Sequence, residues 1–400
     1  MEGRTYELLL SPTQTNQAMQ FAGTVRAVRN AALYQRSTPY RQQRRSIGYV
    51  AQAAEIKDLR HGFDWIAAAP QHCIQQSLRD LDQAFSAFFA GRSAYPKYHR
   101  RGMNDSLRAV ASACGPVRKL NRKRATFHFP KLGDVKFRCS RPLGGEQRQA
   151  TISRHAGKWF VSFCVNVPDW IGPSLPGVIG IDRGVIVAAM PSDGVPLDVP
   201  RPDACEARRR LRLERKLARQ KLGSNRRERT RLRLARLRKR DADRRRDATH
   251  KWTSGVVSRC GTVAIEDLHT SKMTRSAKGT IEKPGKNVAA KSALNREILR
   301  SGWYEIEHQL GYKLARRNGE LVKVNPAYTS QRCHACGYTS PENRENQAKF
   351  RCKACGHRDN ADLNAAKNIR VAGLAISARG GFGIGQPMNC EPSIGLRYVA

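Results

Sequence analysis

Acidic residues are scarce in this chain of 400 residues. It contains 33 Asp and Glu against 73 Lys and Arg, which gives a formal net charge of +40. A compact chain with this imbalance repels itself unless a polyanion neutralises it. The composition therefore predicts nucleic acid as a partner, with a basic protein of the ribosomal type as the plainer alternative.

Long apolar runs are also missing. No stretch approaches the ~18 apolar residues of a membrane-spanning helix, so no membrane span is expected. No secretory leader pattern opens the chain. The eleven cysteines are an odd number, and those outside one C-terminal cluster are scattered, which is typical of a reduced protein rather than a disulfide framework. We expect a cytoplasmic, nucleoid-associated protein.

The C-terminal cysteines form a regular pattern. They read C-x2-C, fifteen residues, C-x2-C, and they are Cys333, Cys336, Cys352 and Cys355. This spacing is typical of a zinc ribbon, in which two tight turns each present two thiolates to one Zn2+. Four cysteines leave no open coordination position, so we expect a structural zinc rather than a reactive one.

Three carboxylates stand at the ends of predicted elements. Asp182 ends the apolar run 178–181, Glu266 ends 263–265, and Asp362 lies at the start of a predicted helix. Such runs are typical of strands buried on both faces of a sheet, and side chains at their ends can converge at one edge. Converging carboxylates repel unless cations lie between them, so the set predicts two Mg2+ (or Mn2+) ions acting on a phosphodiester. For any one residue alone, a turn or helix cap is the competing interpretation.

The first 170 residues divide into a helical and a strand-like part. A strand is expected at 4–10, and helices at 13–36, 46–60 and 71–90. The third helix is the clearest, because apolar residues recur on one face at Ile74, Leu78, Leu81, Phe85 and Phe88. Short alternating runs then predict a small antiparallel β-barrel or sheet, which the opening strand can join. These runs lie at 125–129, 135–138, 149–153 and 158–165.

The remainder alternates buried strands with helices. Strands are expected at 178–182, 185–190, 260–268 and 321–324, and a single helix is expected to run through Leu299 and Leu314. Residues 203–250 predict a helical hairpin, with twenty Arg or Lys and six Asp or Glu between 206 and 247. Such a hairpin has too thin an apolar stripe to form a core by itself. Residues 271–292 are expected to form a mobile basic loop.

Several segments together resemble one known family. The segments 180–184 (Gly-Ile-Asp-Arg-Gly), 264–268 (Ala-Ile-Glu-Asp-Leu) and 361–366 (Ala-Asp-Leu-Asn-Ala-Ala) resemble the three RuvC-like, RNase H-fold motifs of TnpB (OrfB-type) transposon-encoded proteins. The run 325–333 with the following ribbon resembles that family's signature, and 78–89 with Tyr95-Pro96-Lys97 resembles its N-terminal helical region. The resemblance covers roughly residues 4–372.

The resemblance implies an RNA-guided DNA endonuclease, ancestral in type to compact type V CRISPR effectors. A guide RNA made from the transposon end would direct the protein to double-stranded target DNA beside a short flanking motif, and a single RuvC site would cut it. Asp182, Glu266 and Asp362 would then be the catalytic Mg2+ ligands, and Asp359 is the candidate for a fourth ligand. We expect a monomer or a dimer.

The resemblance also implies an α+β fold with two lobes. The first lobe would be a wedge-type β-barrel (1–10 and 107–172) with a helical recognition insert (11–106). The second would be a RuvC-like, RNase H-fold α/β nuclease (175–325 and 358–372), interrupted by the basic helical hairpin (203–250) and the zinc ribbon (326–357). Outside the resemblance, the Gly-rich and weakly patterned residues 373–400 are expected to form a disordered tail.

Nucleic-acid contacts are expected on both lobes. Arg208, Arg209 and Arg210 would contact the backbone of the guide RNA or heteroduplex, because the planar guanidinium bonds two phosphate oxygens. The alternative is a solvated helix pair. Family resemblance places motif reading in the first lobe, where Gln75 and Gln76 are expected on the surface of the predicted helix. There they can bond base edges, or they are ordinary surface polar residues. Lys97 lies in a basic loop with Tyr95, Tyr98 and His99, whose rings can stack on bases or simply pack. By position, the loop 271–292 is a candidate lid.

Three other functions remain open from the sequence. One is an RNA-guided DNA-binding regulator that does not cleave, which the intact acidic trio disfavours. A second is a DNA-transposing enzyme, since RNase H-fold carboxylates also serve transposases. The third is a CRISPR-associated miniature effector of the same ancestry, which only the genomic neighbourhood would distinguish.

Overall fold

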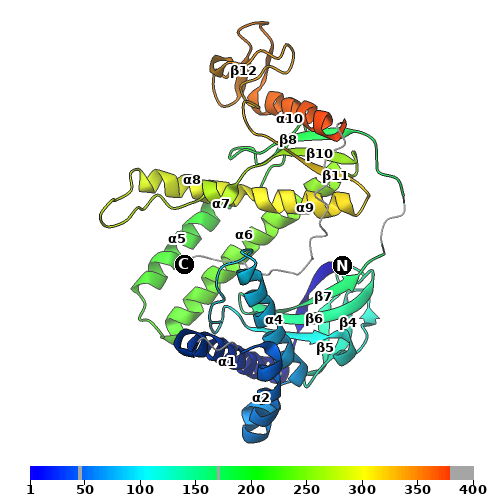
Figure 1. Ribbon diagram of the computed structural model, residues 1–400, viewed down its shortest axis with the longest axis vertical. Coiled ribbons are helices and arrows are strands. Elements are labelled where there is room, and N and C mark those ends of the chain that lie inside the picture. The colour runs from blue at the N-terminus through cyan, green and yellow to red at the C-terminus, as the bar shows by residue number, and fades with distance from the viewer. Residues whose placement is uncertain (44–46, 169–171, 379–400) are drawn as a thin grey trace. The chain divides into compact units, whose positions relative to one another are not determined.

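The computed structural model describes residues 1–43, 47–168 and 172–378. These residues form two compact units, one ending at Pro168 and one following it, and Figure 1 labels their elements. The mixed composition of helices and sheets that the sequence predicts is confirmed. None of the described helices is long and apolar enough to cross a membrane. The finer division into domains stays a prediction.

An antiparallel sheet forms the base of the first unit. Within its described residues the strand order is β2-β6-β7-β1-β5-β4-β3. The opening strand joins this sheet, as expected, because Tyr6 pairs with Val161 on β7 and Leu8 pairs with Phe137 on β5. The strands are β1 (Glu2–Leu9), β2 (Ser106–Val110), β3 (Arg118–Asn121), β4 (Arg124–Phe129), β5 (Gly133–Arg138), β6 (Glu146–His155) and β7 (Lys158–Asn166).

The expected closed barrel is not found in the described part of this unit. Strands β2 and β3 stand at the two ends of the ladder, and each has one neighbouring strand there. β3 reads Arg-Lys-Leu-Asn, and all four residues are exposed. Because β3 buries no apolar side chain, closing the sheet along this edge would gain little, and the sheet stays open.

Helices cover this sheet and share its core. They are α1 (Pro12–Gln43), α2 (Tyr49–Gly62), α3 (Asp64–Ala68) and α4 (Gln71–Phe89). The predicted apolar face of α4 is confirmed for Ile74, Leu78, Leu81 and Phe85, which are buried. These side chains belong to one cluster with the apolar residues of the sheet, including Phe127.

A smaller, mostly parallel sheet forms the centre of the second unit. In the described residues its order is β11-β10-β8-β9. Strands β8 (Val178–Asp182), β10 (Thr262–Glu266) and β11 (Glu320–Val324) are parallel, whereas β9 (Met190–Pro191) is antiparallel to β8. The strand expected at 185–190 is wrong. The backbone N of Gly184 donates to the O of Val187 at 3.1 Å, so the chain turns there and pairs again only from Ala189, which bridges to Leu197.

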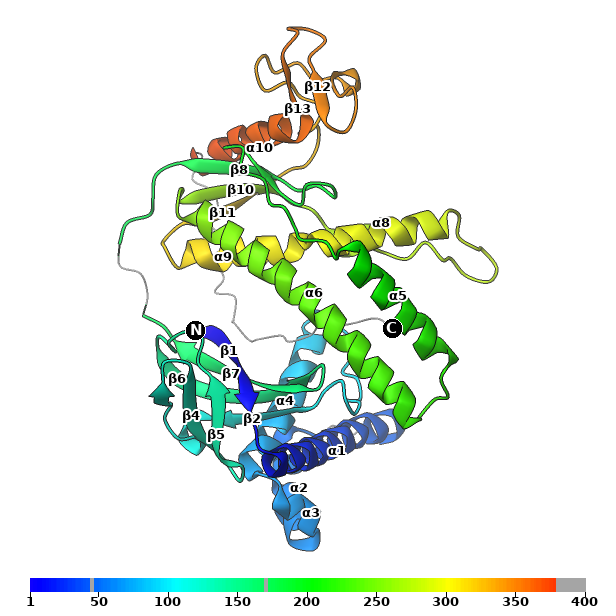
Figure 2. The same cartoon turned by 180° about the vertical axis from the view of Figure 1, so that it is seen from behind.

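Both faces of this sheet are covered, as its apolar strands predict. On one face, Ile181 and Ile265 pack with residues of α6 and α9. On the other face, Ala264 packs with Ile369 of α10. Figures 1 and 2 show the resulting layers, with α10 on one side of the sheet and α9 and α6 on the other. The helices are α5 (Ala204–Arg219), α6 (Asn225–Val257), α7 (Thr270–Met273), α8 (Val288–Ser301), α9 (Trp303–Ala315) and α10 (Ala361–Ala378).

Three boundaries differ from the expectations. The helix expected to run through Leu299 and Leu314 is broken at Gly302, whose φ of +70° ends α8 and begins α9; glycine adopts this backbone without steric cost. The basic loop is shorter than 271–292, because α7 and the start of α8 lie within that range. Helix α10 extends to Ala378, into the segment expected to be a tail, and residues 379–400 lie outside the described residues.

Candidate metal centres and basic surfaces

Two of the three predicted carboxylates end neighbouring strands in register. Ile181 of β8 pairs with Ile265 of β10, so the next residues, Asp182 and Glu266, lie side by side. Side chains alternate between the faces of a sheet. Since Ile181 and Ile265 face α6 and α9, Asp182 and Glu266 point to the face that α10 covers.

The third carboxylate begins α10. Asn360 caps this helix, because its Oδ1 accepts hydrogen bonds from the backbone N of Asp362 at 2.9 Å and of Leu363 at 3.2 Å. A side-chain cap of this kind satisfies backbone N–H groups that have no partner in the first turn of a helix. It places Asp362 in the first turn.

A glycine allows α10 to lie directly on β8. A Cβ at Gly180 would lie 2.2 Å from the backbone O of Ala366 and 2.3 Å from the backbone N of Arg370. The helix backbone therefore occupies the space that any other residue would need at position 180. This close contact brings the first turn of α10 to the edge where Asp182 ends β8.

The three carboxyl groups are close enough to influence one another. Burial, and after it the charges of Glu266 and Asp362, raise the pKa of Asp182 to about 7, against the lowering effect of Arg344. Burial also raises the pKa of Glu266 and of Asp362. The repulsion expected of a cation-binding carboxylate set is therefore present.

These carboxylates are more widely spaced than ligands of one shared ion. Within the ranges that the structure describes, only the four predicted cysteines form a set of three or more ligand groups whose atoms all lie within 4.8 Å of one another. Two ions ~3.5–4 Å apart would spread their ligands over a wider space than one ion does. The acidic set consists of oxygen donors, which suit Mg2+ or Mn2+.

Two basic side chains lie near this set, and the sequence linked neither of them to the carboxylates. Arg183 is fully buried, donates to the backbone O of Glu266, and pairs with Glu307 of α9 at 3.0 Å. Arg344 lies with its Nη2 3.4 Å from the Oδ1 of Asp362. A charged residue directly after a buried strand was a signal for Arg183. Arg344 belongs to the ribbon segment, and no spacing in the sequence links it to a carboxylate 18 residues later.

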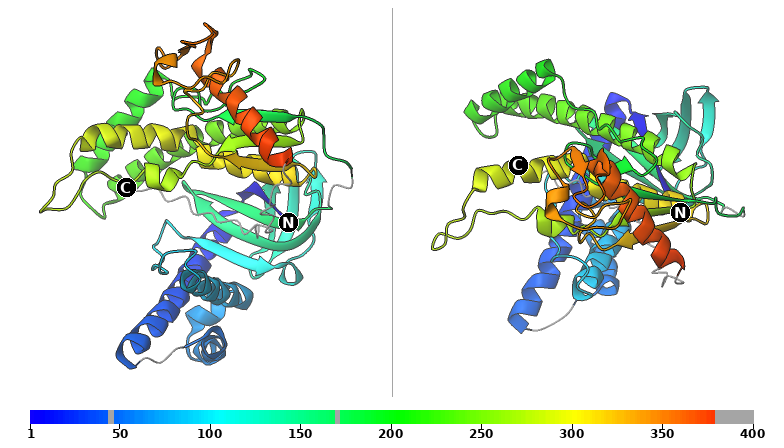
Figure 3. Two further views of the ribbon diagram at one scale, coloured as in Figure 1. Left: turned by 45° about the horizontal axis from the view of Figure 1, so that its top comes forward. Right: turned by 90° about the horizontal axis from the view of Figure 1, so that it is seen from above.

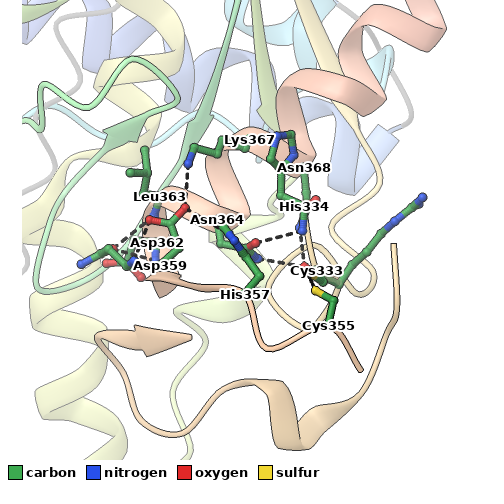
Figure 4. A network of polar contacts seen from close by, with 12 residues as sticks. Cys333, His334, Cys355, His357, Asp359, Asp362, Leu363, Asn364, Lys367 and Asn368 are labelled. Atoms are coloured by element: carbon green, nitrogen blue, oxygen red, sulfur yellow. Dashed lines mark hydrogen bonds and ion pairs between the residues drawn. The ribbon is translucent and has the colours of Figure 1, made fainter. Parts of the chain in front are cut away.

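The candidate fourth ligand, Asp359, has other partners. Its Oδ2 accepts from the Nζ of Lys367 at 2.6 Å and lies 3.8 Å from the Nε2 of His357. Figure 4 shows Lys367 reaching back along α10 to this carboxylate. Asp359 therefore anchors the start of α10, and nothing in its contacts supports a role as a fourth ligand.

The four cysteines fit a tetrahedral zinc ion. The Sγ atoms of Cys333 and Cys355 are 3.7 Å apart, and those of Cys336 and Cys352 are 3.6 Å apart. A tetrahedron with Zn–S bonds of ~2.3 Å has edges of about 3.8 Å. The backbone N–H of Cys355 lowers the pKa of Cys352 to about 6, which favours a metal-binding thiolate at that position, whereas burial raises the pKa of Cys333. The set could hold zinc, and the strands β12 (Lys349–Arg351) and β13 (Arg358–Asn360) lie around it.

The basic hairpin displays its predicted residues to solvent. Arg208, Arg209 and Arg210 are all exposed on α5. α5 and α6 lie side by side (Figure 3) and are joined by ion pairs, Arg244 with Glu206 at 2.5 Å and Arg238 with Glu214 at 3.0 Å. Glu206 and Glu214 thus join the two helices. Arg210 also pairs with Glu214 at 3.0 Å, and all three arginines are exposed. Their contact with RNA stays a prediction.

The predicted residues of the first unit differ in accessibility. Lys97 is exposed and Gln75 is partly buried, but Gln76 is 8% exposed. The expectation of a surface position for Gln76 is wrong, because α1, α2 and β2 all contact α4 and widen its buried face.

Of the three rings in the loop around Lys97 that could stack on bases, two are instead packed against the rest of the protein. The ring of Tyr95 packs edge-on against Phe88, with centroids 5.3 Å apart. Burial lowers the pKa of His99 to about 4. Tyr98 is 52% exposed, so its ring alone of the three is mostly accessible.

Two family models match this chain. Residues 162–277 match a family described as "Probable transposase" (OrfB, IS605 type). Residues 303–369 match "Cas12f1-like, TNB domain". The first segment contains Asp182 and Glu266, and the second contains the four cysteines and Asp362.

Full-length relatives are similar over almost the whole chain. The chain is 37% identical to "Putative RNA-guided DNA endonuclease InsQ" of Escherichia coli strain K12, over 99% of this chain and 98% of that protein. It is 30% identical to "Putative RNA-guided DNA endonuclease" of Streptomyces pristinaespiralis, over 94% and 91%. The fold is similar to that of Cas12f1 in a cryo-EM structure of its complex with sgRNA and target DNA, with a TM-score of 0.55, 15% identity, and coverage of 88% and 81%.

Proposed function

The chain belongs to the TnpB (OrfB-type) family of transposon-encoded proteins, and on this basis we propose that it is an RNA-guided DNA endonuclease. It would cut double-stranded target DNA beside a short flanking motif, directed by a guide RNA made from the transposon end. The observation that carries the proposal is geometric: Asp182 and Glu266 end paired strands in register, and the helix that begins with Asp362 packs directly on the first of these strands.

Asp182, Glu266 and Asp362 would hold the divalent ions, Mg2+ or Mn2+. When bound, the ions would activate the attacking water and stabilise the leaving oxygen of a phosphodiester. The raised pKa of Asp182, about 7, means that this group gives up its proton only near neutral pH or when a cation replaces it. The binding of cations is therefore favoured, because it neutralises the repulsion between the charged carboxylates.

Arg344 would act on the phosphate. Its guanidinium lies 3.4 Å from Asp362 and is partly exposed, so it can also reach a group bound beside that carboxylate. A guanidinium binds two phosphate oxygens at once and keeps its charge at any working pH. We therefore assign Arg344 the neutralisation of charge on the scissile phosphate.

The ribbon would hold one zinc ion through Cys333, Cys336, Cys352 and Cys355. A closed set of four thiolates serves structure rather than reaction. Its role would be to fix the segment that carries Arg344.

Nucleic-acid binding would be divided between the two units. Arg208, Arg209 and Arg210 would contact the backbone of guide RNA or of the heteroduplex, which is recognised by shape rather than by sequence. Lys97 and Gln75 of the first unit are accessible enough to contact the flanking-motif region of the target.

A plasmid-cleavage assay tests this proposal. The protein would be purified with its co-expressed RNA, the RNA sequenced, and the complex offered a target plasmid beside a library of flanking motifs. We expect linear products only with Mg2+ or Mn2+ and with a matching guide. Target binding without strand scission would instead support a regulator, and products joined to new DNA would support a transposing enzyme.

A further inference from the structure

The hydroxyl of Thr329 lies against one of the proposed ion ligands. It donates to the Oε1 of Glu266 at 2.6 Å. The backbone O of Pro326 is also within reach, at 3.1 Å, but the nearer carboxylate makes the stronger bond with the single hydroxyl proton. In the described ranges 1–43, 47–168 and 172–378, no hydrogen bond engages the Oε2 of Glu266. One oxygen is therefore held and the other is left for a ligand.

We propose that Thr329 is a positioning residue for Glu266, and that α10 and the zinc ribbon hold its loop, residues 325–332, in the required place. This proposal rests on the proposed function, because it treats Glu266 as an ion ligand. Outer hydrogen bonds of this kind orient ligating carboxylates, and their loss commonly weakens metal binding 10–100-fold.

Two asparagines of α10 donate hydrogen bonds to the backbone of this loop. The Nδ2 of Asn368 donates to the backbone O of Thr329 at 2.9 Å and of Arg332 at 2.7 Å. The Nδ2 of Asn364 donates to the same O of Arg332 at 2.8 Å. Asn364 and Asn368 are four residues apart and so lie on one face of the helix. The helix that begins with Asp362 thus also fixes the loop that holds Glu266.

The same asparagine extends this support into the ribbon. The Oδ1 of Asn364, which is fully buried, accepts from the backbone N of His334 at 3.0 Å. Figure 4 shows this contact beside Cys333, the first zinc ligand. Because Cys333 directly follows Arg332, the position of the ribbon's first thiolate and that of the loop are set together.

The backbone of the loop is itself held in an unfavourable shape. Tyr328, which precedes Thr329, has a φ of +63°, in the left-handed region that non-glycine residues rarely adopt. Such a conformation persists only where surrounding contacts impose it. Here the O of Tyr328 accepts from the backbone N of Gln331 and of Arg332, each at 3.0 Å. These contacts therefore fix the loop backbone, and with it the position of Thr329.

The test compares Thr329→Val, which removes the hydroxyl at nearly constant volume, with Thr329→Ser, which keeps it. Thr339→Val is the matched control, because Thr339 is an exposed ribbon residue whose hydroxyl makes only a 3.4 Å contact. Two readouts are measured for each purified complex with its RNA: Mn2+ binding by electron paramagnetic resonance, and the Mg2+ concentration that half-saturates cleavage. Zinc content is measured alongside.

We expect Thr329→Val to weaken Mn2+ binding and to raise the Mg2+ requirement about tenfold or more, with zinc content unchanged. Thr329→Ser and Thr339→Val should remain within about twofold of the unaltered protein. Equal defects in Thr329→Ser and Thr329→Val, or an unchanged ion requirement in Thr329→Val, would overturn the proposal. If Thr329→Val does not fold, Asn368→Ala carries the test, because it releases the loop without removing the hydroxyl and should weaken ion binding in the same direction.

The two readouts separate this proposal from the proposed function. If the unaltered complex binds Mn2+ but cuts no DNA, the endonuclease proposal fails, and the comparison of Mn2+ binding between the two Thr329 variants still decides the role of Thr329. If the unaltered complex binds no divalent ion, both fail.

Discussion

Arg344 lies 3.4 Å from Asp362, measured from Nη2 to Oδ1, and so connects the cysteine ribbon to the acidic edge of the second sheet. The same guanidinium donates to the backbone O of Gln347 at 3.1 Å, inside the ribbon. The position of this cation therefore depends on how the ribbon is folded. A zinc ion that does no chemistry can still control the charge beside the proposed nuclease site.

Loss of zinc should therefore abolish cleavage without touching the carboxylates. We predict that Cys336→Ser lowers bound zinc well below one ion per chain, measured by elemental mass spectrometry, and abolishes plasmid cleavage. Cys205→Ser, which changes an exposed cysteine outside the ribbon, should leave both unchanged. Full cleavage by a zinc-free Cys336→Ser protein would refute the link between ribbon and site.

Gly180 should tolerate no side chain. In Gly180→Ala the new Cβ would meet the backbone of Ala366 at 2.2 Å, and a helix backbone cannot yield as a flexible side chain can. We predict a loss of about 1–3 kcal/mol in the free energy of unfolding, measured with denaturant, and slower cleavage because Asp362 shifts with α10.

Gly255→Ala in α6 is the matched control for this substitution. Its Cβ would meet only the Nη1 of Arg259, at an ordinary 3.7 Å. Since alanine is favoured over glycine inside helices, this variant should be neutral or up to about 1 kcal/mol more stable. A Gly180→Ala protein as stable and active as Gly255→Ala would contradict the close packing of α10 on β8.

Asp182 should make the metal-free protein less stable as pH rises. Its pKa is raised from an ordinary 3.8 to about 7, so between these values the folded chain holds a proton that the unfolded chain has released. The stabilisation is complete below pH ~4 and is lost as pH rises through ~7. From pH 5 to 7, in buffer without Mg2+, we predict a loss of about 2 kcal/mol in the free energy of unfolding relative to Asp182→Asn. Identical pH profiles for the two proteins would show that Asp182 titrates normally.

The arginine cluster on α5 should contribute charge to RNA binding. Replacing Arg208, Arg209 and Arg210 together by Ala should weaken guide-RNA binding and reduce the slope of log K against log salt by about 2, since each lost single-strand phosphate contact removes roughly 0.7. The triple Lys variant keeps the charge and should keep the slope. A slope that is the same in all three proteins, measured by filter binding over a salt series, would exclude this surface.

Much of the acidic edge and of the ribbon was predictable, because short stretches of sequence indicate where strands end and where helices begin. Apolar runs that end in Asp182 and Glu266 indicate buried parallel strands, and a helix start at Asp362 follows from its sequence. The paired cysteine spacing likewise indicates a ribbon. Thr329 and Arg183 were not identified as site residues, and Arg344 was not linked to the carboxylates, because each acts through a contact that only the folded chain creates.

Other expectations were wrong where contacts with distant segments of the chain, or local backbone turns, determine the structure. Gln76 is buried because three elements converge on α4, which a single helical stripe does not reveal. The strand expected after Asp182 is lost to a turn at Gly184, although its residues have the composition of a strand. The predicted barrel stays open because the edge strand beginning at Arg118 has no buried residue.

The central claim is that Asp182, Glu266 and Asp362 form one ion-binding site that cuts DNA. The most direct measurement is cleavage of a matched target plasmid by the RNA-bound protein in Mg2+, compared with Asp182→Asn, while target binding is followed in parallel. The account predicts equal target binding by the two proteins and strand scission only by the unaltered one. Undiminished scission by Asp182→Asn would contradict it.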